Sequence, residues 1–245
     1  MIYRSNLTAP ALQQNFKHLH VRPMPHSFGH DVPSDWADKA EDDPVFGLYK
    51  NCGMWTHDEA AILFDVSARL TYTFPGSLAL DIGAHTGWTS IHMAAGGMRV
   101  IALEPMFAKA EFHQRFRDNV NGSATAVAQR SDEFFVRRSA GSLFRLVCVD
   151  GDHEPGKPLE DAQDSAKHLT ETGVIIFHDF IGNPVREAVQ WLMMEGFKCR
   201  VYFTPHVVAC CWRGDFAPPD HTPDPDVRRQ LLDGRMSDFD FTRCD

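Results

Sequence analysis

The chain has 245 residues, of which 43% are hydrophobic, which is enough apolar material for one large globular domain with a buried core. Its formal net charge of −9 opposes an electrostatic grip on nucleic acid or on an anionic membrane surface. No apolar run reaches membrane-spanning length, and the six cysteines form no C-x-x-C pair. We therefore expect a cytoplasmic protein without a membrane segment, a zinc ribbon or a disulfide framework.

The chain divides into three segments by composition. Residues 1–55 are rich in Pro, His and aromatic residues and predict an irregular N-terminal arm, with one short helix over 10–19. The arm either caps a substrate pocket or only packs onto the main domain. Residues 56–213 form the predicted main domain. Residues 214–245 are rich in Pro and Asp and predict a tail, extended or draped on the surface, with one short helix over 227–232.

The most informative stretch runs from Leu78 to Pro105. It predicts a buried strand (78–81), a tight glycine turn (83–87), a helix (88–95) and a second strand (100–103) that ends on Glu104. Gly83 and Gly87 carry no Cβ, so the backbone can turn sharply and a ligand can approach it closely. A helix N-terminus behind such a turn attracts an anionic group, and Glu104 can accept both hydroxyls of a ribose. These features predict a nucleotide-binding βαβ unit.

The spacing within this unit separates two classes of cofactor. Dinucleotide enzymes prefer G-x-G-x-x-G, whereas this turn reads D-x-G-x-x-x-G. An acid at a strand end suits a ligand that carries a sulfonium or amino group, which favours S-adenosylmethionine over NAD. The turn and the following Ala-Leu-Glu-Pro closely resemble class I methyltransferases, especially the FkbM-like group. The cofactor residues predicted here are Asp81, Gly83, Ala84, His85, Gly87, Trp88 and Glu104.

Strand and helix patterns alternate along the main domain. Helices are predicted over 56–71, 107–119, from Pro158 to the Thr172-Gly173 stop, and over 184–195, and further strands over 124–128, 143–149, 174–177, 197–203 and 207–212. The last two strands read as a closing hairpin pair. This order predicts an α/β fold: a Rossmann-like, doubly wound, mostly parallel sheet with a terminal antiparallel strand.

Ionisable residues gather where the predicted strands end, at the edge of an open parallel sheet where ligands bind. The residues are Asp81, Glu104, Asp132, Asp150, Asp152, His153, His178 and Asp179. Each has a structural explanation of its own: a cap for Asp150, a surface position for His153, core packing for His178. In the resembling fold the loop after the third strand contacts adenine, so Asp132 is a further cofactor candidate, with a helix N-cap as the equal alternative. The joint pattern favours a functional edge.

The second half also resembles the macrocin- and mycinamicin-type sugar O-methyltransferases, through Val-Asp-Gly-Asp-His at 149–153 and Phe-His-Asp-Phe at 177–180. That resemblance implies Asp150 as a cofactor neighbour and metal ligand, Asp179 as a second ligand, and His153 or Asp152 as the catalytic base. His178 stands where those enzymes usually have an acid. It joins the predicted metal group, but a histidine favours a softer divalent ion over Mg²⁺. A metal and a metal-free histidine–carboxylate base both stay open.

The sequence thus predicts an S-adenosylmethionine-dependent methyltransferase that acts on oxygen of a small molecule or glycoside, in natural-product or saccharide tailoring. The alternatives are a non-catalytic partner subunit that binds the cofactor and, less favoured, an NAD(P)-dependent oxidoreductase. The acidic charge and the missing N-P-P-Y-like motif disfavour nucleic-acid methylation. The identity of the methyl acceptor and assembly as a homo-oligomer are left open.

Overall fold

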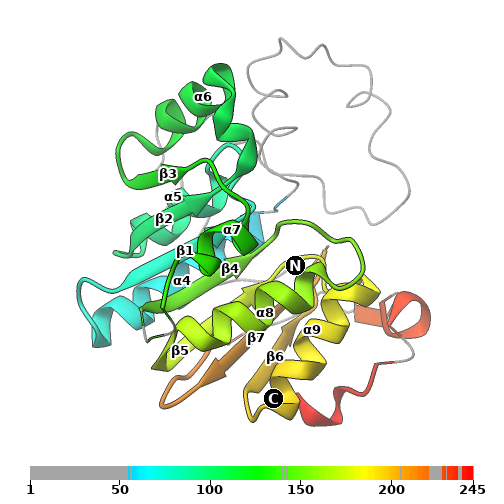
Figure 1. Cartoon of the computed structure of the whole chain (residues 1–245). Helices are drawn as coiled ribbons and strands as arrows, with labels where there is room; N and C mark the ends of the chain where they lie inside the picture. The colour runs from blue at the N-terminus through cyan, green and yellow to red at the C-terminus, as the bar shows by residue number, and fades with distance from the viewer. Residues whose placement is uncertain are drawn as a thin grey trace.

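The computed structural model describes residues 55, 57–139, 141, 143–204, 206–220, 228–229, 231–236 and 239–244. The predicted arm, apart from Trp55, and its helix over 10–19 lie outside these residues. The described chain forms a seven-stranded sheet between two layers of helices (Figure 1). Among the described helices, none is both long enough and apolar enough to cross a membrane.

The strands follow the order β3-β2-β1-β4-β5-β7-β6 across the sheet. Their bounds are Leu78–Ile82 (β1), Arg99–Leu103 (β2), Ala124–Val127 (β3), Phe144–Val149 (β4), Leu169–Phe177 (β5), Lys198–Tyr202 (β6) and Val208–Arg213 (β7). Strands β1 to β5 pair in parallel, and β7 is antiparallel to both of its neighbours, β5 and β6. The Rossmann-like fold and the closing hairpin pair are confirmed. The crossover to β6 leaves a gap beside β5, and β7 fills it.

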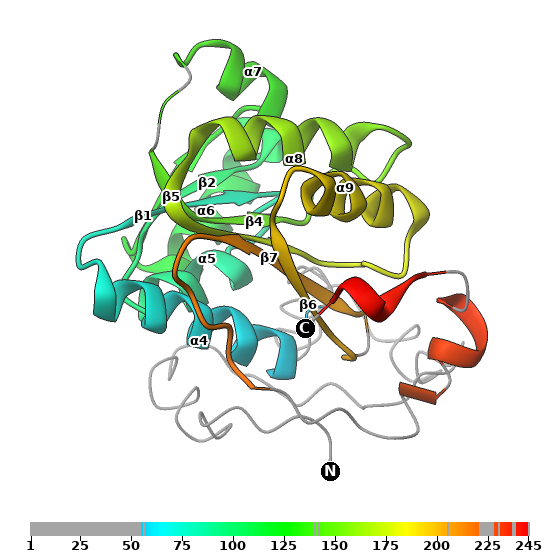
Figure 2. The same cartoon turned by 90° about the horizontal axis from the view of Figure 1, so that it is seen from below.

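Three helices cover each face of the sheet (Figure 2). Helices α4 (His57–Thr73), α5 (Trp88–Ala95) and α6 (Ala110–Val120) lie on one face, and α7 (Ser131–Val136), α8 (Lys157–His168) and α9 (Asn183–Met194) lie on the other. Successive residues of a strand point to opposite faces, so Ala79 joins the core under α4 and Leu80 joins the core under α8. Burial on both faces explains why the central strands are continuous apolar runs.

The structure departs from the predicted boundaries at two places. The helix predicted over 107–119 is divided into a 3₁₀ turn (Pro105–Ala108) and α6, with Lys109 extended between them. Strand β5 begins at Leu169, five residues before the predicted start. Leu169 pairs with Phe144, and a Cβ on Gly173 would lie 2.6 Å from Cγ of Leu169. Gly173, which is predicted from the sequence to end a helix, instead lies within the strand and leaves room for the side chain of Leu169.

The described part of the C-terminal segment packs into the domain. The Tyr202 hydroxyl donates a hydrogen bond to the carbonyl oxygen of Pro219 at 3.0 Å. Met236 is fully buried and Phe239 is 7% exposed, and both lie in the core on the α8–α9 face. The sequence predicts a tail extended or draped on the surface, whereas these two side chains complete the core. A short π-helical turn, Leu231–Arg235, lies near the predicted tail helix.

Candidate functional site

A cavity of about 390 Å³ opens at the carboxyl ends of β1, β2 and β4. Strand order reverses beside β1, since β2 and β3 follow it on one side and β4 and β5 on the other. This is the switch point at which open α/β sheets bind ligands. The lining residues are Ile82, Gly83, His85, Leu103, Glu104, Pro105, Gln129, Arg130, Ser131, Asp150, Gly151, Asp152, Lys157 and Asp161.

The two predicted glycines are required by packing as well as by the turn. Gly83 has φ +83, and a Cβ there would lie 2.1 Å from the carbonyl oxygen of Asp150. Gly87, with φ +96, precedes α5, and its Cβ would lie 2.6 Å from Cγ1 of Val120. Gly83 lines the cavity and lets the ends of β1 and β4 approach each other. Gly87 brings the turn against α6.

Glu104 is held in place by backbone donors at the cavity wall. Its Oε1 accepts a hydrogen bond from the Met106 N–H at 3.0 Å, and its Oε2 accepts from the His85 N–H at 3.2 Å. A carboxylate offers about four lone-pair sites, so two such bonds fix its orientation and leave acceptor capacity for a ligand. His85 has φ +45, and burial is the main cause of the lowered pKa of its ring. Glu104 and His85 thus lie together at the cavity wall, and their role in binding a cofactor stays a prediction.

Asp81 lies inside the domain, behind the cavity wall. Its Oδ2 accepts hydrogen bonds from the hydroxyls of Thr89, at 2.7 Å, and Ser90, at 2.5 Å. Burial raises the pKa of Asp81 to about 7. Ala84 and Trp88 are also buried and, with Asp81, stand outside the cavity lining given above. In this structure Asp81 ties β1 to the start of α5.

The loop after β3 reaches the cavity through Gln129, Arg130 and Ser131. The neighbouring Asp132 lies outside the lining, with a side chain 53% exposed. Its Oδ1 accepts from the Glu133 N–H at 2.9 Å and from Nε of Arg130 at 3.3 Å. The loop therefore adjoins the cavity as expected, while Asp132 itself makes local contacts at the start of α7.

Asp161 on α8 is a lining residue that the sequence analysis missed. It is 6% exposed, burial raises its pKa to about 6, and a hydrogen bond from the Ser131 side chain works against that rise. The sequence feature that could have indicated Asp161 is its place directly beside Ala162, which belongs to the apolar stripe of the helix. It joins α8 to the loop after β3.

A second group of ionisable side chains adjoins the cavity through Asp150. Nε2 of His153 lies 3.6 Å from Oδ2 of Asp179 and 3.9 Å from Oδ1 of Asp150. Nδ1 of His178 lies 3.2 Å from Oδ2 of Asp179 and 3.4 Å from Oδ1 of Asp150. The structure therefore brings together four of the predicted residues. Asp179 has φ +53, a left-handed conformation that turns the chain directly after His178.

Asp152 points to the other side of the cavity mouth. Its Oδ1 accepts from the Glu154 N–H at 3.0 Å, and its Oδ2 lies 3.9 Å from Nη2 of Arg130. The carboxylates beside His153 are therefore those of Asp150 and Asp179.

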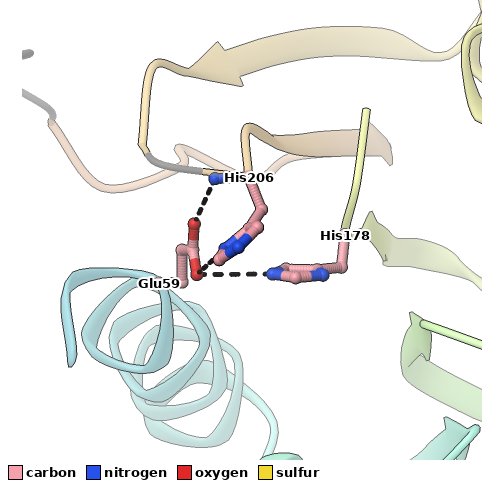
Figure 3. Close-up of side chains that lie close together, drawn as sticks. All are labelled: Glu59, His178 and His206. Atoms are coloured by element: carbon pink, nitrogen blue, oxygen red, sulfur yellow. Dashed lines mark hydrogen bonds and ion pairs between the residues drawn. The ribbon is translucent and has the colours of Figure 1, made fainter. Parts of the chain in front are cut away.

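Three further residues of the site have no counterpart in the sequence predictions. The indole N–H of Trp55 donates to Oδ2 of Asp150 at 2.6 Å, and its ring stacks on His178 with centroids 4.4 Å apart. On the other side of His178, Oε2 of Glu59 on α4 lies 3.3 Å from Nε2 of His178 and 3.3 Å from Nδ1 of His206, which precedes β7 (Figure 3). Glu59 and His206 are 147 residues apart in the sequence, so local patterns do not reveal the group.

Charge balance in this buried cluster is reflected in its pKa values. Burial alone would lower the pKa of His178, but Asp150, Asp179 and Glu59 together raise it well above its usual value. Burial alone would raise the pKa of Glu59, yet His206 and His178 hold it well below its usual value. At neutral pH the Glu59 carboxylate is therefore ionised although its side chain is fully buried.

The donors at the ends of β4 and β5 do not fit Mg²⁺. That ion takes oxygen ligands in near-ideal octahedral geometry. The described residues there offer two carboxylates, Asp150 and Asp179, and both face the imidazoles of His153 and His178. One oxygen of Asp150 also accepts the indole N–H of Trp55. A mixed set of oxygen and nitrogen donors favours a softer divalent ion, in keeping with His178 as the departure from the resembling enzymes.

Comparisons with known proteins agree with this fold. A family profile described as a methyltransferase domain matches residues 80–180, which contain all of the lining residues. A search of curated proteins found no match.

Solved structures give the same fold. One is a protein from Corynebacterium glutamicum, with TM-score 0.55 and 12% identity, covering 66% of this chain and 82% of that one. Precorrin-6y C5,15-methyltransferase from Geobacter metallireducens has TM-score 0.52 and 18% identity, covering 66% and 90%. A candidate O-methyltransferase from Klebsiella pneumoniae has TM-score 0.51 and 18% identity, covering 68% and 86%. These comparisons do not distinguish the FkbM-like or macrocin-type subgroup, which stays a prediction. Residues 80–180 thus match a methyltransferase-domain profile, and the chain has the fold of these solved methyltransferase structures.

Proposed function

We propose that this protein is an S-adenosylmethionine-dependent O-methyltransferase that acts on a small molecule or a glycoside. The observation that carries the proposal is the position of Asp150, which lines the cofactor cavity and also lies beside His153 and His178. A cofactor in the cavity and an acceptor near His153 would therefore adjoin each other. The similar Klebsiella structure, a candidate O-methyltransferase, favours oxygen as the methylated atom.

The cavity offers the contacts that this cofactor requires. Glu104 presents a carboxylate oriented by two backbone N–H groups, suited to the hydroxyls of a ribose. Gln129, Arg130 and Ser131 supply polar groups on the wall formed by the loop after β3. When bound, S-adenosylmethionine supplies an electrophilic methyl group on a sulfonium. The protein then has to align the acceptor and remove its proton.

His153 is the proposed general base. Its side chain is 40% exposed and so can meet an acceptor, and Nε2 lies 3.6 Å from Asp179 and 3.9 Å from Asp150. These carboxylates stabilise the imidazolium that forms when the ring takes a proton. Proton removal by an imidazole suits a phenol or another acidic hydroxyl better than a free alkyl hydroxyl. No step is assigned to Mg²⁺, because the donor set does not fit that ion.

The cofactor assignment is tested by calorimetric titration with S-adenosylhomocysteine. We expect wild-type protein to bind the ligand, and Glu104→Gln to weaken binding at least about 10-fold, since a charge-assisted hydrogen bond contributes roughly 1.5–3 kcal/mol. Glu111→Gln, an exposed carboxylate on α6, is the matched control and should bind like wild type. Equal affinity of the Glu104→Gln variant and wild type for S-adenosylhomocysteine would contradict the cofactor assignment. NAD serves as the control ligand that is not expected to bind.

The base is tested by comparing turnover with cofactor affinity. His153→Ala should lower kcat by about 10²–10⁴-fold on an accepted phenol or hydroxyl, while S-adenosylhomocysteine still binds normally. His113→Asn, on α6 and outside the cavity lining, is the control. A His153→Ala variant with unchanged kcat would exclude the proposed base without touching the cofactor assignment.

A further inference from the structure

We infer that Glu59, His178 and His206 form a binding site for a transition-metal ion of the zinc type, distinct from the strand-end carboxylates. Glu59 lies in the first turn of α4, His178 directly follows β5, and His206 precedes β7. The three side chains point toward one another (Figure 3). Neither the family match nor the proposed methyl transfer requires this site, so the inference stands independently of both.

Two of the three pairs of donor atoms have the spacing of ligands bound to one metal ion. Oε2 of Glu59 lies 3.3 Å from Nε2 of His178 and 3.3 Å from Nδ1 of His206. Two ligands bound tetrahedrally to zinc at about 2.0–2.1 Å are separated by about 3.3–3.4 Å. Charge-assisted hydrogen bonds are shorter, roughly 2.7–2.9 Å. One ligand atom from each of the three residues lies within 4.8 Å of the other two.

The chemistry of the donors selects the type of ion. Two imidazoles and one carboxylate form the protein ligands of many catalytic zinc sites and also suit other late first-row ions. Mg²⁺ and Ca²⁺ prefer oxygen and are not expected here. Glu59 and His178 have side chains 0% and 1% exposed, whereas the His206 side chain is 17% exposed. An ion would therefore enter from the His206 side, where a fourth ligand position can face solvent.

The surrounding contacts decide which nitrogen of His178 binds the ion. The distances alone do not show which ring nitrogen of His178 binds the ion, because Nδ1 also lies 3.2 Å from Oδ2 of Asp179 and 3.4 Å from Oδ1 of Asp150. Among the described residues, Nδ1 makes no hydrogen bond of good geometry, but a proton on it would face these two carboxylates, so the ion would take the place of the proton on Nε2. Metal-bound histidines usually donate their other ring N–H to a carboxylate in this way. Asp150 and Asp179 thus act as outer carboxylates.

Two further contacts hold the ligands in position. Oε1 of Glu59 accepts from the His206 backbone N–H at 2.9 Å, which turns Oε2 toward the two imidazoles. Trp55 stacks on the His178 ring at an interplanar angle of 16°, which fixes the plane of that ring. An ion here would join α4 to the segment before β7 and would set the orientation of the Asp150–Asp179 pair. The three ligands are positioning residues for that pair.

The test uses the full-length protein, stripped with a chelator and titrated with Zn²⁺, and with Co²⁺ for its visible spectrum. We expect one ion per wild-type chain and a tetrahedral cobalt spectrum. His206→Ala and Glu59→Gln should each weaken binding at least about 100-fold, more than the roughly 10–100-fold expected for an outer carboxylate variant such as Asp179→Asn. His206 is partly exposed, so its variant is the one expected to fold normally, checked by circular dichroism.

His153→Asn is the matched control, because His153 contacts the same two carboxylates but is not a ligand of this site. Unchanged zinc affinity in His206→Ala would overturn the inference. So would the absence of zinc binding by wild-type protein at micromolar concentrations. A greater loss in His153→Asn than in His206→Ala would place the ion among the strand-end carboxylates and would equally overturn it.

Discussion

Gly83 shows how a single residue serves both the fold and the cavity at the strand ends. Replacing it with Ala would place a Cβ 2.1 Å from a backbone oxygen of Asp150, at a φ of +83. We expect Gly83→Ala to lower the free energy of unfolding in urea by more than the roughly 1–3 kcal/mol that a strained backbone alone costs.

Gly122 provides the matched control for this substitution. Its φ is +79, and a Cβ there would meet nothing within 4 Å. The difference between Gly83→Ala and Gly122→Ala therefore isolates the close approach of β1 to β4. Equal losses of stability in the two variants would show that backbone conformation alone makes Gly83 necessary.

Asp81 gives stability a pH dependence of definite sign. Its pKa is about 7 in the folded protein against an ordinary value of 3.8, so between these values the folded state holds the extra proton. Its contribution is fully present below pH 3.8 and is lost as the pH rises through 7. Relative to Asp81→Asn, wild type should lose up to about 1.4 kcal/mol per pH unit in this window, measured by urea unfolding. A difference that is constant with pH would contradict the raised pKa.

Individual site residues could be predicted only where local sequence carries the signal. Glu104 and Asp150 follow directly after apolar runs and Asp179 comes one residue later, so their places at the sheet edge could be inferred. Asp81 also follows an apolar run and Asp132 lies in the loop after a strand, yet Asp81 is buried behind the cavity and Asp132 makes local contacts. Glu59 and His206 meet only through tertiary folding, which leaves no local pattern.

At the scale of elements, helices α4 and α5 are packed closely enough to require Gly96 at their contact. A Cβ there would lie 2.4 Å from Cβ of Ser67, while its φ of −71 suits any residue. Gly96→Ala should therefore destabilise the protein by about 1–3 kcal/mol through overpacking alone. Thermal or urea unfolding measures this loss.

Gly141→Ala is the control for the helix contact, because a Cβ there would meet nothing within 4 Å. Since Glu59 lies on α4, the Gly96→Ala variant should also weaken zinc binding. A stable Gly96→Ala variant would mean that the two helices separate easily.

Most elements could be predicted because hydrophobic periodicity sets them. Helix α5 and strand β1 agree with the prediction to within one residue, since each is bounded by glycine or by a change of polarity. The early start of β5 could not be predicted, because Leu169 pairs with Phe144 across a register shift. The position of β7 between β5 and β6 is likewise a property of the whole sheet.

At the scale of the whole molecule, the C-terminal segment completes the core. Met236 is fully buried there, so Met236→Ala should cost about 2–5 kcal/mol in the free energy of unfolding. Met194→Ala is the control, since that side chain is 69% exposed and should change stability by less than about 0.5 kcal/mol. Similar unfolding midpoints for the two variants would show that the segment contributes little to the fold.

Because Trp55 stacks on His178, tryptophan fluorescence can report on events at His178. An imidazole in contact with an indole quenches its fluorescence, and it does so more strongly when the ring carries a proton. The chain has five tryptophans, so the signal of this one is the difference between wild type and Trp55→Phe. Events at His178, whether proton loss or the arrival of an ion, would then be visible in the emission of the protein itself, without any added dye.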